Sequence, residues 1–553
     1  MLEEYIHYFE SETEFNNHLN SSAYTEPFLS THPVGTGASA STKVTYNLKD
    51  LGRPLTFEIV SGGTLYWYAS HTDNPKTIEY SKNGGEWTSI TSSQDNGGSG
   101  TTISTVVAGD KIKFRGINTT YATNNRWTIF NCTEDCLFYA YGNVMSLINY
   151  NNFRTNNYIK NGSFRGLFYL NTGILSHDKK ILCLPATSNL NYYTYQDMFN
   201  GCTRLRRAPD LPATSIAGTC YYGMFKNCAS LEEMPKMAVT DTGSDSLRMM
   251  FYGCTSLKKG YINGGYLGNA CCMQMFYGCT SLEEFTFPTT QNSFGPSGQS
   301  LREMFYGCTN LKKITPYKIN GNLSNHCVNM FRDCTSLVDA SGIEILSDAL
   351  SGRFCEEMFR GCTSLKYPPK IMTTAWNYNC FHNMFYGCTS LEVAPECTCS
   401  SAGDSGAYGM FYGCTSLRDA STVHLLADTL NADCYRSMFQ GCTSLVNPPQ
   451  ISATTMAASR CMMGMFYGCS NLEVAPDLYI DSVSYNGFNE MFRGCTKLRY
   501  IKCLATALNG YTTNWVNGVQ TTAGTFVKHP DMNDWSRGNA GIPNNWTIED
   551  AVI

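Results

Sequence analysis

The chain has 553 residues and a formal net charge of −5 at pH 7, and only 15% of its residues are charged. That balance, without any run of Lys or Arg, excludes the basic surface with which nucleic-acid-binding proteins hold phosphates. No apolar stretch approaches the roughly 18 residues of a membrane span, and 35 tyrosines among many Gly, Ser, Thr and Asn favour extracellular or particle-borne binding over metabolic catalysis.

Residues 1–42 are expected to form a separate N-terminal segment that docks or oligomerises. Residues 5–9 can form a short strand, and Ser11-Glu-Thr-Glu14 has the pattern of a capping box that opens a short helix through Leu19. The small residues of 35–42 predict a linker. The chain starts without a basic region, an apolar run or a lipobox cysteine, so we expect no secretory or lipoprotein signal.

Residues 43–130 predict an antiparallel β-sandwich module of jelly-roll type. Short runs with strand-forming residues alternate with Gly- and Asn-rich turns, as in an all-β module. The candidate runs are 56–60, 64–68, 77–80, 87–90, 103–107 and 111–115. Residues 131–190 are expected to be a transition that caps the next region, with Gly166-Leu-Phe168 as a reduced copy of its repeat.

Between Met198 and Leu498 the chain repeats a variant of Met-Phe-x-Gly-Cys-Thr-Ser-Leu, with a step of 25 to 29 residues. The repeat methionines, position i below, are Met198, Met224, Met250, Met275, Met304, Met330, Met358, Met384, Met410, Met438, Met465 and Met491. A period of this length predicts a solenoid, because one unit cannot bury its apolar side alone. We place the solenoid at 191–510 and a C-terminal cap at 511–553, in which Gly524-Thr-Phe526 is a last echo of the repeat.

Each coil is predicted to hold one short helix, one short strand and a variable return loop, which makes an α+β solenoid. Met at i, Cys at i+4 and Leu at i+7 would share one side of a helix. Position i+3 is Gly except for Asn227 and Asp333, the residue types that best tolerate left-handed backbone after Gly. The helix is therefore expected to end at i+3 with a left-handed cap.

The 26 cysteines are interpreted mainly as buried, reduced core residues. Twelve occupy position i+4, and a partial second column lies three or four residues before the Met. Disulfides are an alternative only for Cys132 with Cys136 and for Cys397 with Cys399. Nine His and the absence of a Cys-x-x-Cys pair disfavour zinc, so no metal or cofactor is expected.

Position i+2 is a candidate binding column because it points away from the Met, Cys and Leu side. Its tyrosines are Tyr252, Tyr277, Tyr306, Tyr386, Tyr412 and Tyr467. A row of Tyr suits stacking on sugar rings or protein surfaces, and the alternative is a packing ladder between coils. Six copies carry other residues there, which argues against one uniform site: Asn200, Lys226, Arg332, Arg360, Gln440 and Arg493. Long return loops such as 285–299 are equally open as contact points.

The repeated phrase resembles the BspA-like leucine-rich repeat of gut Bacteroidales and their phages, over roughly 195–500. Residues 78–88 and 106–112 are similar to the β module that commonly precedes such arrays. The resemblance implies adhesion or ligand binding. The spacing of receptor-type leucine-rich repeats is absent, so their properties are not carried over. The start, at 5–9 and 24–28, is similar to the N-termini of Bacteroides phage fibre-type proteins, in which this segment docks on the virion.

The leading hypothesis is therefore a non-enzymatic phage appendage, a tail or head fibre located on the virion, whose solenoid binds a host-surface polysaccharide or protein. Its N-terminal segment would contact other virion proteins, and analogy favours a homotrimer. The alternative is a bacterial cell-surface adhesin with the same repeats. A polysaccharide-cleaving appendage is disfavoured, because such enzymes need paired carboxylates at a fixed separation and the acidic residues recur at no single repeat position.

Overall fold

The computed structural model describes residues 29–32, 44–47, 52–69, 76–94, 100–119, 121, 127–154, 158–185, 189–289, 293–294, 298–320, 324–346, 352–520, 522–533 and 535–552. The chain divides into two compact units, Met1–Leu282 with Thr290–Gly295, and Glu283–Thr289 with Pro296–Ile553. The strand predicted at 5–9, the helix predicted through Leu19 and the linker at 35–42 lie outside the described residues. Within the N-terminal segment and just after it, β1 (Leu29–His32) pairs antiparallel with β2 (Val44–Asn47).

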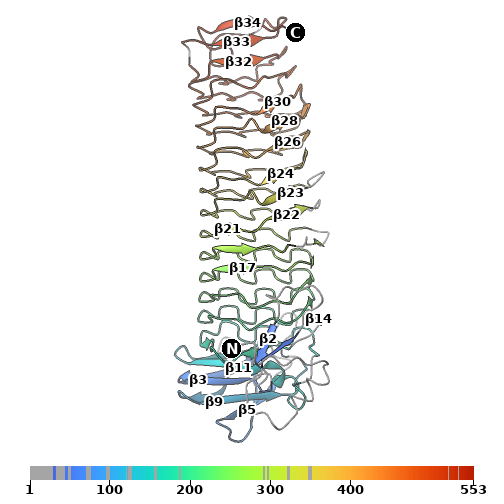
Figure 1. The fold of residues 1–553 in the computed structure, drawn as a ribbon, viewed down its shortest axis with the longest axis vertical. Helices are drawn as coiled ribbons and strands as arrows, with labels where there is room; N and C mark the ends of the chain where they lie inside the picture. The colour runs from blue at the N-terminus through green and yellow to red at the C-terminus, as the bar shows by residue number, and fades with distance from the viewer. Residues whose placement is uncertain are drawn as a thin grey trace. The chain divides into compact units, whose positions relative to one another are not determined.

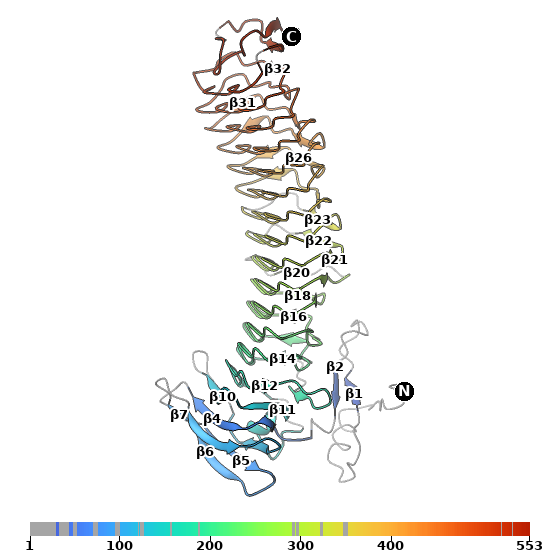
Figure 2. The same ribbon diagram turned by 90° about the vertical axis from the view of Figure 1, so that its left-hand side faces the viewer.

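Two sheets build the β module of the first unit (Figure 2). The first contains β3 (Thr56–Ser61), β5 (Thr77–Lys82), β6 (Thr88–Thr91), β9 (Lys111–Gly116), β11 (Leu137–Asn143), β12 (Ile174–Leu175) and β13 (Leu182–Cys183). The second contains β4 (Gly63–Ala69), β7 (Ser93–Gln94), β8 (Thr101–Val106) and β10 (Thr128–Cys132). The six strands predicted from the sequence are present as β3, β4, β5, β6, β8 and β9. A 3-10 turn, η3 (Val144–Leu147), follows β11.

The two sheets share an aromatic core. Phe57 on β3 lies 5.1 Å from Phe130 on β10 between ring centres, and Phe130 in turn lies 4.5 Å from Trp67 on β4. All three side chains are fully buried. Phe114 and Phe138 complete the cluster around Phe57 at 4.7 and 4.4 Å. Burial of several large aromatic side chains contributes on the order of 1.5–3 kcal/mol for each, which is the main stabilising term of this module.

The rest of both units consists of coils whose short strands pair in parallel with equivalent residues of the next coil (Figure 1). The first unit contains β14 (Asn189–Leu190), β15 (Ser215–Ile216), β16 (Asp241–Thr242), β17 (Lys259–Tyr261), β18 (Tyr266–Leu267) and β20 (Ser293–Phe294). The second contains β19 (Glu284–Thr286), β21 (Lys313–Ile314), β22 (Tyr317–Asn320), β23 (Ile343–Leu346), β24 (Lys370–Ile371), β25 (Ala375–Trp376), β26 (Cys397–Cys399), β27 (Ser401–Ala402), β28 (Val423–Leu425), β29 (Thr429–Leu430), β30 (Gln450–Ile451), β31 (Thr455–Met456), β32 (Tyr500–Cys503), β33 (Thr525–Lys528) and β34 (Thr547–Asp550).

The prediction of a helix in each coil, and with it the α+β class, was wrong. The described residues contain no α-helix, and the chain is a nearly all-β solenoid of about 13 turns. The Met-Phe phrase folds as a series of tight turns, in which alternate amides bind in two directions. Met410 and Tyr412 donate to carbonyls three residues earlier, whereas Phe411 and Gly413 donate to Met438 and Gln440 of the next coil. An α-helix would instead direct every amide to the carbonyl four residues back.

Left-handed backbone at every fourth residue explains why a helix cannot form here. The left-handed conformation predicted at i+3 is confirmed in all twelve copies, including Asn227 (φ 57°) and Asp333 (φ 60°). A second left-handed residue, which the sequence analysis missed, stands at i−1, for example Met249 (φ 55°) and Glu357 (φ 54°). For an L-residue this conformation costs about 1–2 kcal/mol, so it persists because the coil-to-coil hydrogen bonds and the buried columns require it.

Inside the coils, equivalent side chains stack on one another. Phe411 lies 5.4 Å from Phe385 and 5.2 Å from Phe439, with rings within 13° of parallel. The prediction of buried thiols at i+4 is confirmed, because all twelve are fully buried and free. Each thiol for which a contact is defined donates to the Phe carbonyl of the preceding coil, as Cys414 does to Phe385 at 3.1 Å. Burial raises the pKa of Cys414 to about 12, so it stays protonated as this donor.

The outlying cysteines Cys132, Cys136, Cys397 and Cys399 are also free. The reduced copy predicted at 166–168 is a coil of its own, because Phe168 stacks on Phe199 at 5.4 Å and Gly166 is left-handed. The echo predicted at 524–526 was wrong, since Phe526 lies on β33. The last turn of the repeat type is instead marked by left-handed Asn514 and Gly518.

Candidate functional site: the turn face

The outward positions of the turns form a continuous surface, which we call the turn face and define as positions i−2 and i+2 of the repeats. The residues at i, i+1 and i+4 are fully buried in every copy. Because the turns repeat every four residues, i−2 and i+2 lie on the same side, where every copy except Asn200 and Val328 is partly exposed. Within each unit the face therefore carries two columns of side chains that continue from coil to coil.

All six tyrosines predicted at i+2 are half-buried on this face. In the first unit Tyr252 stacks on Tyr277 with ring centres 4.7 Å apart and planes within 5°. In the second unit Tyr386 stacks on Tyr412 at the same distance and within 4°. The flat sides of the rings therefore pack against the neighbouring coil, and part of each side chain stays exposed.

The cationic residues at i+2, which the sequence analysis took as interruptions, belong to the same column. Arg360 lies 4.5 Å above the ring of Tyr386. Similar contacts join Lys226 to Tyr252 at 5.0 Å, Arg332 to Tyr306 at 5.3 Å and Arg493 to Tyr467 at 5.3 Å. A cation over an aromatic face gains about 0.5–1 kcal/mol at exposed sites. Every one of the six tyrosines thus contacts a second ring or a cation in an adjacent coil.

Acidic residues at i−1 fix the arginines of this column. Glu357 forms ion pairs with Arg360 of its own coil and with Arg332 of the preceding coil. Glu490 holds Arg493 at 2.6 Å in the same way. Because exposed ion pairs contribute only about 0–1 kcal/mol each, their main effect here is to orient the guanidinium planes along the stack.

The second column, at i−2, was missed from the sequence. In it Tyr408 contacts the ring of His382 at 4.9 Å and the guanidinium of Arg436 at 5.4 Å. Asp433 binds Arg436 at 3.2 Å and also holds Arg460 through two hydrogen bonds of 2.8 and 2.9 Å. The signal that could have revealed this column is its position four residues before i+2, since a turn period of four places both on one side.

The contacts of the turn face join rings, cations and carboxylates of adjacent coils. Among the described residues there is no group of three or more His, Cys, Asp and Glu side chains that could hold a metal ion. The described chain also has no helix with the length and apolar character of a membrane span. Whether the six tyrosines bind a ligand stays a prediction, because the same contacts also serve packing between coils.

Comparison with known proteins identifies the repeats. The family model described as a BspA type leucine-rich repeat region matches residues 187–298 and 272–418, in six copies. The chain carries BspA-type leucine-rich repeats. A second model, described as a Mycoplasma protein of unknown function, DUF285, matches residues 405–531. Repeats of the BspA type are typical of extracellular or surface proteins that bind rather than catalyse.

Two solved structures resemble the chain at low identity. One is a leucine-rich repeat protein from Bacteroides ovatus ATCC 8483, 16% identical, with 66% of this chain and 88% of that chain covered and a TM-score of 0.29. The other is a TLR13–ssRNA13 complex, 16% identical, with 64% of this chain and 46% of that chain covered and a TM-score of 0.24. No curated protein matches the sequence.

Proposed function

We propose that this chain is a non-enzymatic, adhesin-type repeat protein that acts at a cell surface and binds a surface polysaccharide or protein through its turn face. The observation that supports it best is the ladder of Tyr and Arg side chains, each held by a ring or an ion pair before any partner arrives. Tyr and Arg are enriched where protein interfaces gain most of their energy.

Pre-ordering is what turns this ladder into a favourable binding surface. Immobilising a flexible side chain on binding costs about 0.5–1.5 kcal/mol. In Tyr386, Tyr412 and Arg360 that cost is already met on folding, because the three groups stack on one another. A partner that lies along the coils can therefore contact several rings and guanidinium groups with little further loss of entropy.

The test is adhesion of the full chain to cells or immobilised glycans after Tyr306→Ser, Tyr386→Ser and Tyr412→Ser are combined. We expect adhesion to be lost while the far-UV spectrum stays unchanged, since each exposed stacking contact contributes only about 0.5–1.5 kcal/mol. The matched control is Tyr479→Ser with Tyr500→Ser, two tyrosines of the second unit that lie off the turn face. Full adhesion by the triple variant would remove the turn face from consideration.

A phage appendage is the second candidate, and the free thiols favour it. All 26 cysteines lie in the described part of the chain without a disulfide, as suits a protein that folds and assembles in a reducing cytoplasm. In this version the turn face would bind the host, and the N-terminal segment would dock on the particle and form a trimer. Mass spectrometry of purified phage particles decides between the two, because peptides of this chain are expected only in the second case.

A further inference from the structure

In the second unit, one side of the coils carries a row of parallel strands from β22 to β34, which we call the strand side and which excludes the separate sheet β25-β27-β29-β31. This row is interrupted at two places. Its strands form three separate sheets, β22-β23-β24, β26-β28-β30 and β32-β33-β34. Among the described strands, β24 has no ladder with β26, and β30 has none with the coil that follows it. Each break comes after a coil that contains two consecutive prolines, Pro368-Pro369 or Pro448-Pro449.

Proline causes the breaks by removing a donor that the other coils use. Ala340 donates its amide to the carbonyl of Tyr367 in the next coil at 2.8 Å, and Ala420 does the same to Asn447 at 2.9 Å. Pro368 and Pro448 occupy this repeat position in their own coils and have no amide hydrogen. The two Pro-Pro coils lie three coils apart, and each is followed by the same sequence, Glu-Val-Ala-Pro, at 392–395 and 473–476.

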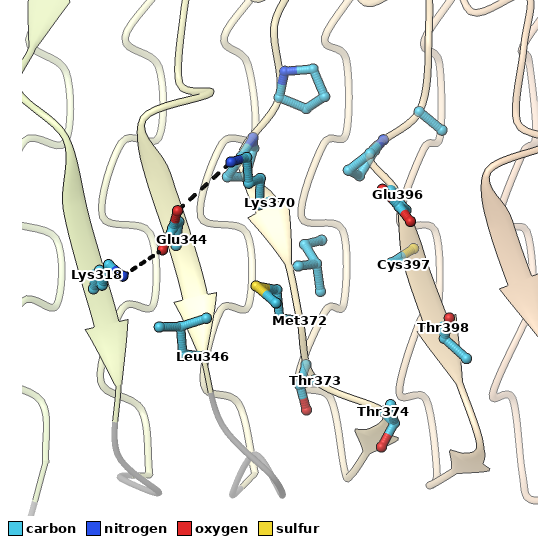
Figure 3. A pocket seen from close by; sticks show the side chains of 15 residues that line it. Lys318, Glu344, Leu346, Lys370, Met372, Thr373, Thr374, Glu396, Cys397 and Thr398 are labelled. Carbon is cyan, nitrogen blue, oxygen red and sulfur yellow. Dashed lines mark ion pairs between the residues drawn. The ribbon is translucent and has the colours of Figure 1, made fainter.

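At the first break the strand side is hollowed, with a volume of about 900 Å3 (Figure 3). One rim is a row of charged side chains on three adjacent strands, in which Glu344 pairs with Lys318 at 3.2 Å and with Lys370 at 3.7 Å. Glu396 on the neighbouring coil forms the opposite rim. Two ammonium groups thus share one carboxylate, which leaves the first rim with a net positive charge beside an acidic one.

The floor and one end of the hollow are apolar. Ala394 and Cys397 line the floor and are buried, while Leu346 and Met372 stand side by side on β23 and just after β24. Met372 is 64% exposed and is therefore accessible to a partner. Its flexible thioether side chain suits adaptable apolar binding surfaces. Thr373, which also lines the hollow, is buried, and its Oγ1 has no hydrogen-bond partner within the described structure.

The second break shows which of these features the fold itself does not need. Strand register aligns the row Lys318, Glu344 and Lys370 with Thr398, His424 and Gln450. Met372 lies two residues after Lys370, and the corresponding residue two after Gln450 is Ser452. Both coils keep the prolines and the break, so the lysines and the exposed methionine are not required for the geometry. Their presence at the first break alone calls for another explanation.

We propose that the hollow at β24 binds an extended peptide segment in which an apolar side chain stands next to a carboxylate. The apolar side chain packs against Met372 and Leu346 over the floor, and the carboxylate accepts from Lys370 and Lys318. The Glu396 carboxylate on the opposite rim faces the backbone of the segment. A peptide is favoured over a sugar because no aromatic ring lines the hollow. The site uses no turn-face residue, so it stands or falls independently of the proposed adhesion.

The experiment titrates the full chain with fluorescein-labelled hexapeptides built around Leu-Gly-Glu, Met-Gly-Glu or Val-Gly-Glu, since residues i and i+2 of an extended segment share one face, and follows polarisation. Met372→Ser is expected to weaken binding about tenfold, since it removes an apolar contact that becomes buried when the peptide binds. Lys370→Gln is expected to weaken it about threefold, in line with an exposed ion pair. Both substitutions introduce the residue that the second Pro-Pro coil already carries, so the fold tolerates them, and unchanged thermal unfolding verifies this.

The control variant is Gln450→Ala with Ser452→Ala at the second break, which should leave peptide binding unchanged. Peptides with Gln in place of Glu, or Ser in place of the apolar residue, should bind more weakly than the parent to the wild-type chain only. The proposal is overturned if none of the peptides binds, if Met372→Ser and Lys370→Gln bind them as well as the wild type, or if the same two variants abolish binding of a neutral oligosaccharide instead.

Discussion

The β module and the coils solve the same problem, burial of aromatic side chains, in opposite ways. In the module each ring has its own surroundings, and Phe57 meets Phe114, Phe130 and Phe138 at angles from 27° to 77°. In the coils one ring is repeated, and Phe411 meets identical neighbours nearly face to face on both sides. A side chain in the module therefore stabilises one place, whereas a side chain in a coil stabilises two interfaces.

The largest expected effect comes from removing one ring of each kind. Phe411→Ala and Phe57→Ala should each destabilise their surroundings by about 3–5 kcal/mol, as for other buried Phe. The comparison predicts different ranges: hydrogen exchange should accelerate in the coils on both sides of Phe411, whereas around Phe57 it should accelerate within the module and as far as Phe168, whose ring centre lies 6.0 Å away. Phe411→Leu should show the same pattern at smaller amplitude. Exchange confined to the coil of Phe411 would contradict the idea of shared interfaces.

A smaller effect distinguishes the module by its response to acid. The carboxylate of Asp110 accepts from Asn83 at 2.7 Å and from the Val107 amide at 2.8 Å, and it pairs with Lys82 at 2.9 Å. The Lys82 hydrogen bond in particular lowers its pKa to about 2. A lowered folded-state pKa contributes stability above the unfolded value near 4 that is lost as pH falls toward 2.

We therefore expect Asp110→Asn to cost about 2 kcal/mol at pH 7 and to flatten the acid dependence of the module. The measurement is hydrogen exchange of the paired strands β5 and β9 between pH 5 and 2, corrected for intrinsic rates. The coils serve as the internal reference, since this substitution should leave their exchange unchanged. An unaltered acid profile of β5 and β9 in the variant would show that Asp110 does not govern it.

The smallest effect concerns the thiol column, which has no counterpart in the module. Cys388 donates to the Phe359 carbonyl of the preceding coil at 3.1 Å. Cys388→Val keeps the approximate shape but removes the donor and should cost about 1 kcal/mol, measured by urea unfolding. Cys388→Ser restores a donor and is expected to recover part of the loss. A valine variant as stable as the wild type would reduce the column to simple packing.

Much of the coil could be predicted because its sequence repeats. The buried Cys, the left-handed residue at i+3 and the outward Tyr at i+2 follow from which residue types recur at a fixed position. The helix was predicted wrongly because the spacing of Met410 and Cys414 fits a period of 3.6 and a period of four equally well. The left-handed residue at i−1 distinguishes the two periods, and it is Gly409 in this coil. Its equivalents include Met249 and Glu357, residue types that do not indicate left-handed backbone.

The candidate site was harder to predict than the fold for a related reason. In the sequence, the i+2 column consists of Tyr positions interrupted by Arg, which argues against a continuous site. The structure shows that a cation such as Arg360 lies over a ring such as Tyr386 of the next coil. The hollow at β24 depends on a missing hydrogen bond at Pro368, which becomes visible only when the partner carbonyl in the next coil is known. Both features belong to neighbouring coils rather than to any one repeat.

The Pro-Pro coils also define how a chain of this type can change its length. Since residues 392–395 and 473–476 are the same four residues, Glu-Val-Ala-Pro, removing the three-coil segment 392–472 would join two surfaces that already fit. Duplicating the same three coils would extend the array with one more break and no new kind of contact. Loss or gain of a single coil between the two Pro-Pro coils would instead change the distance between the two breaks, which are now three coils apart.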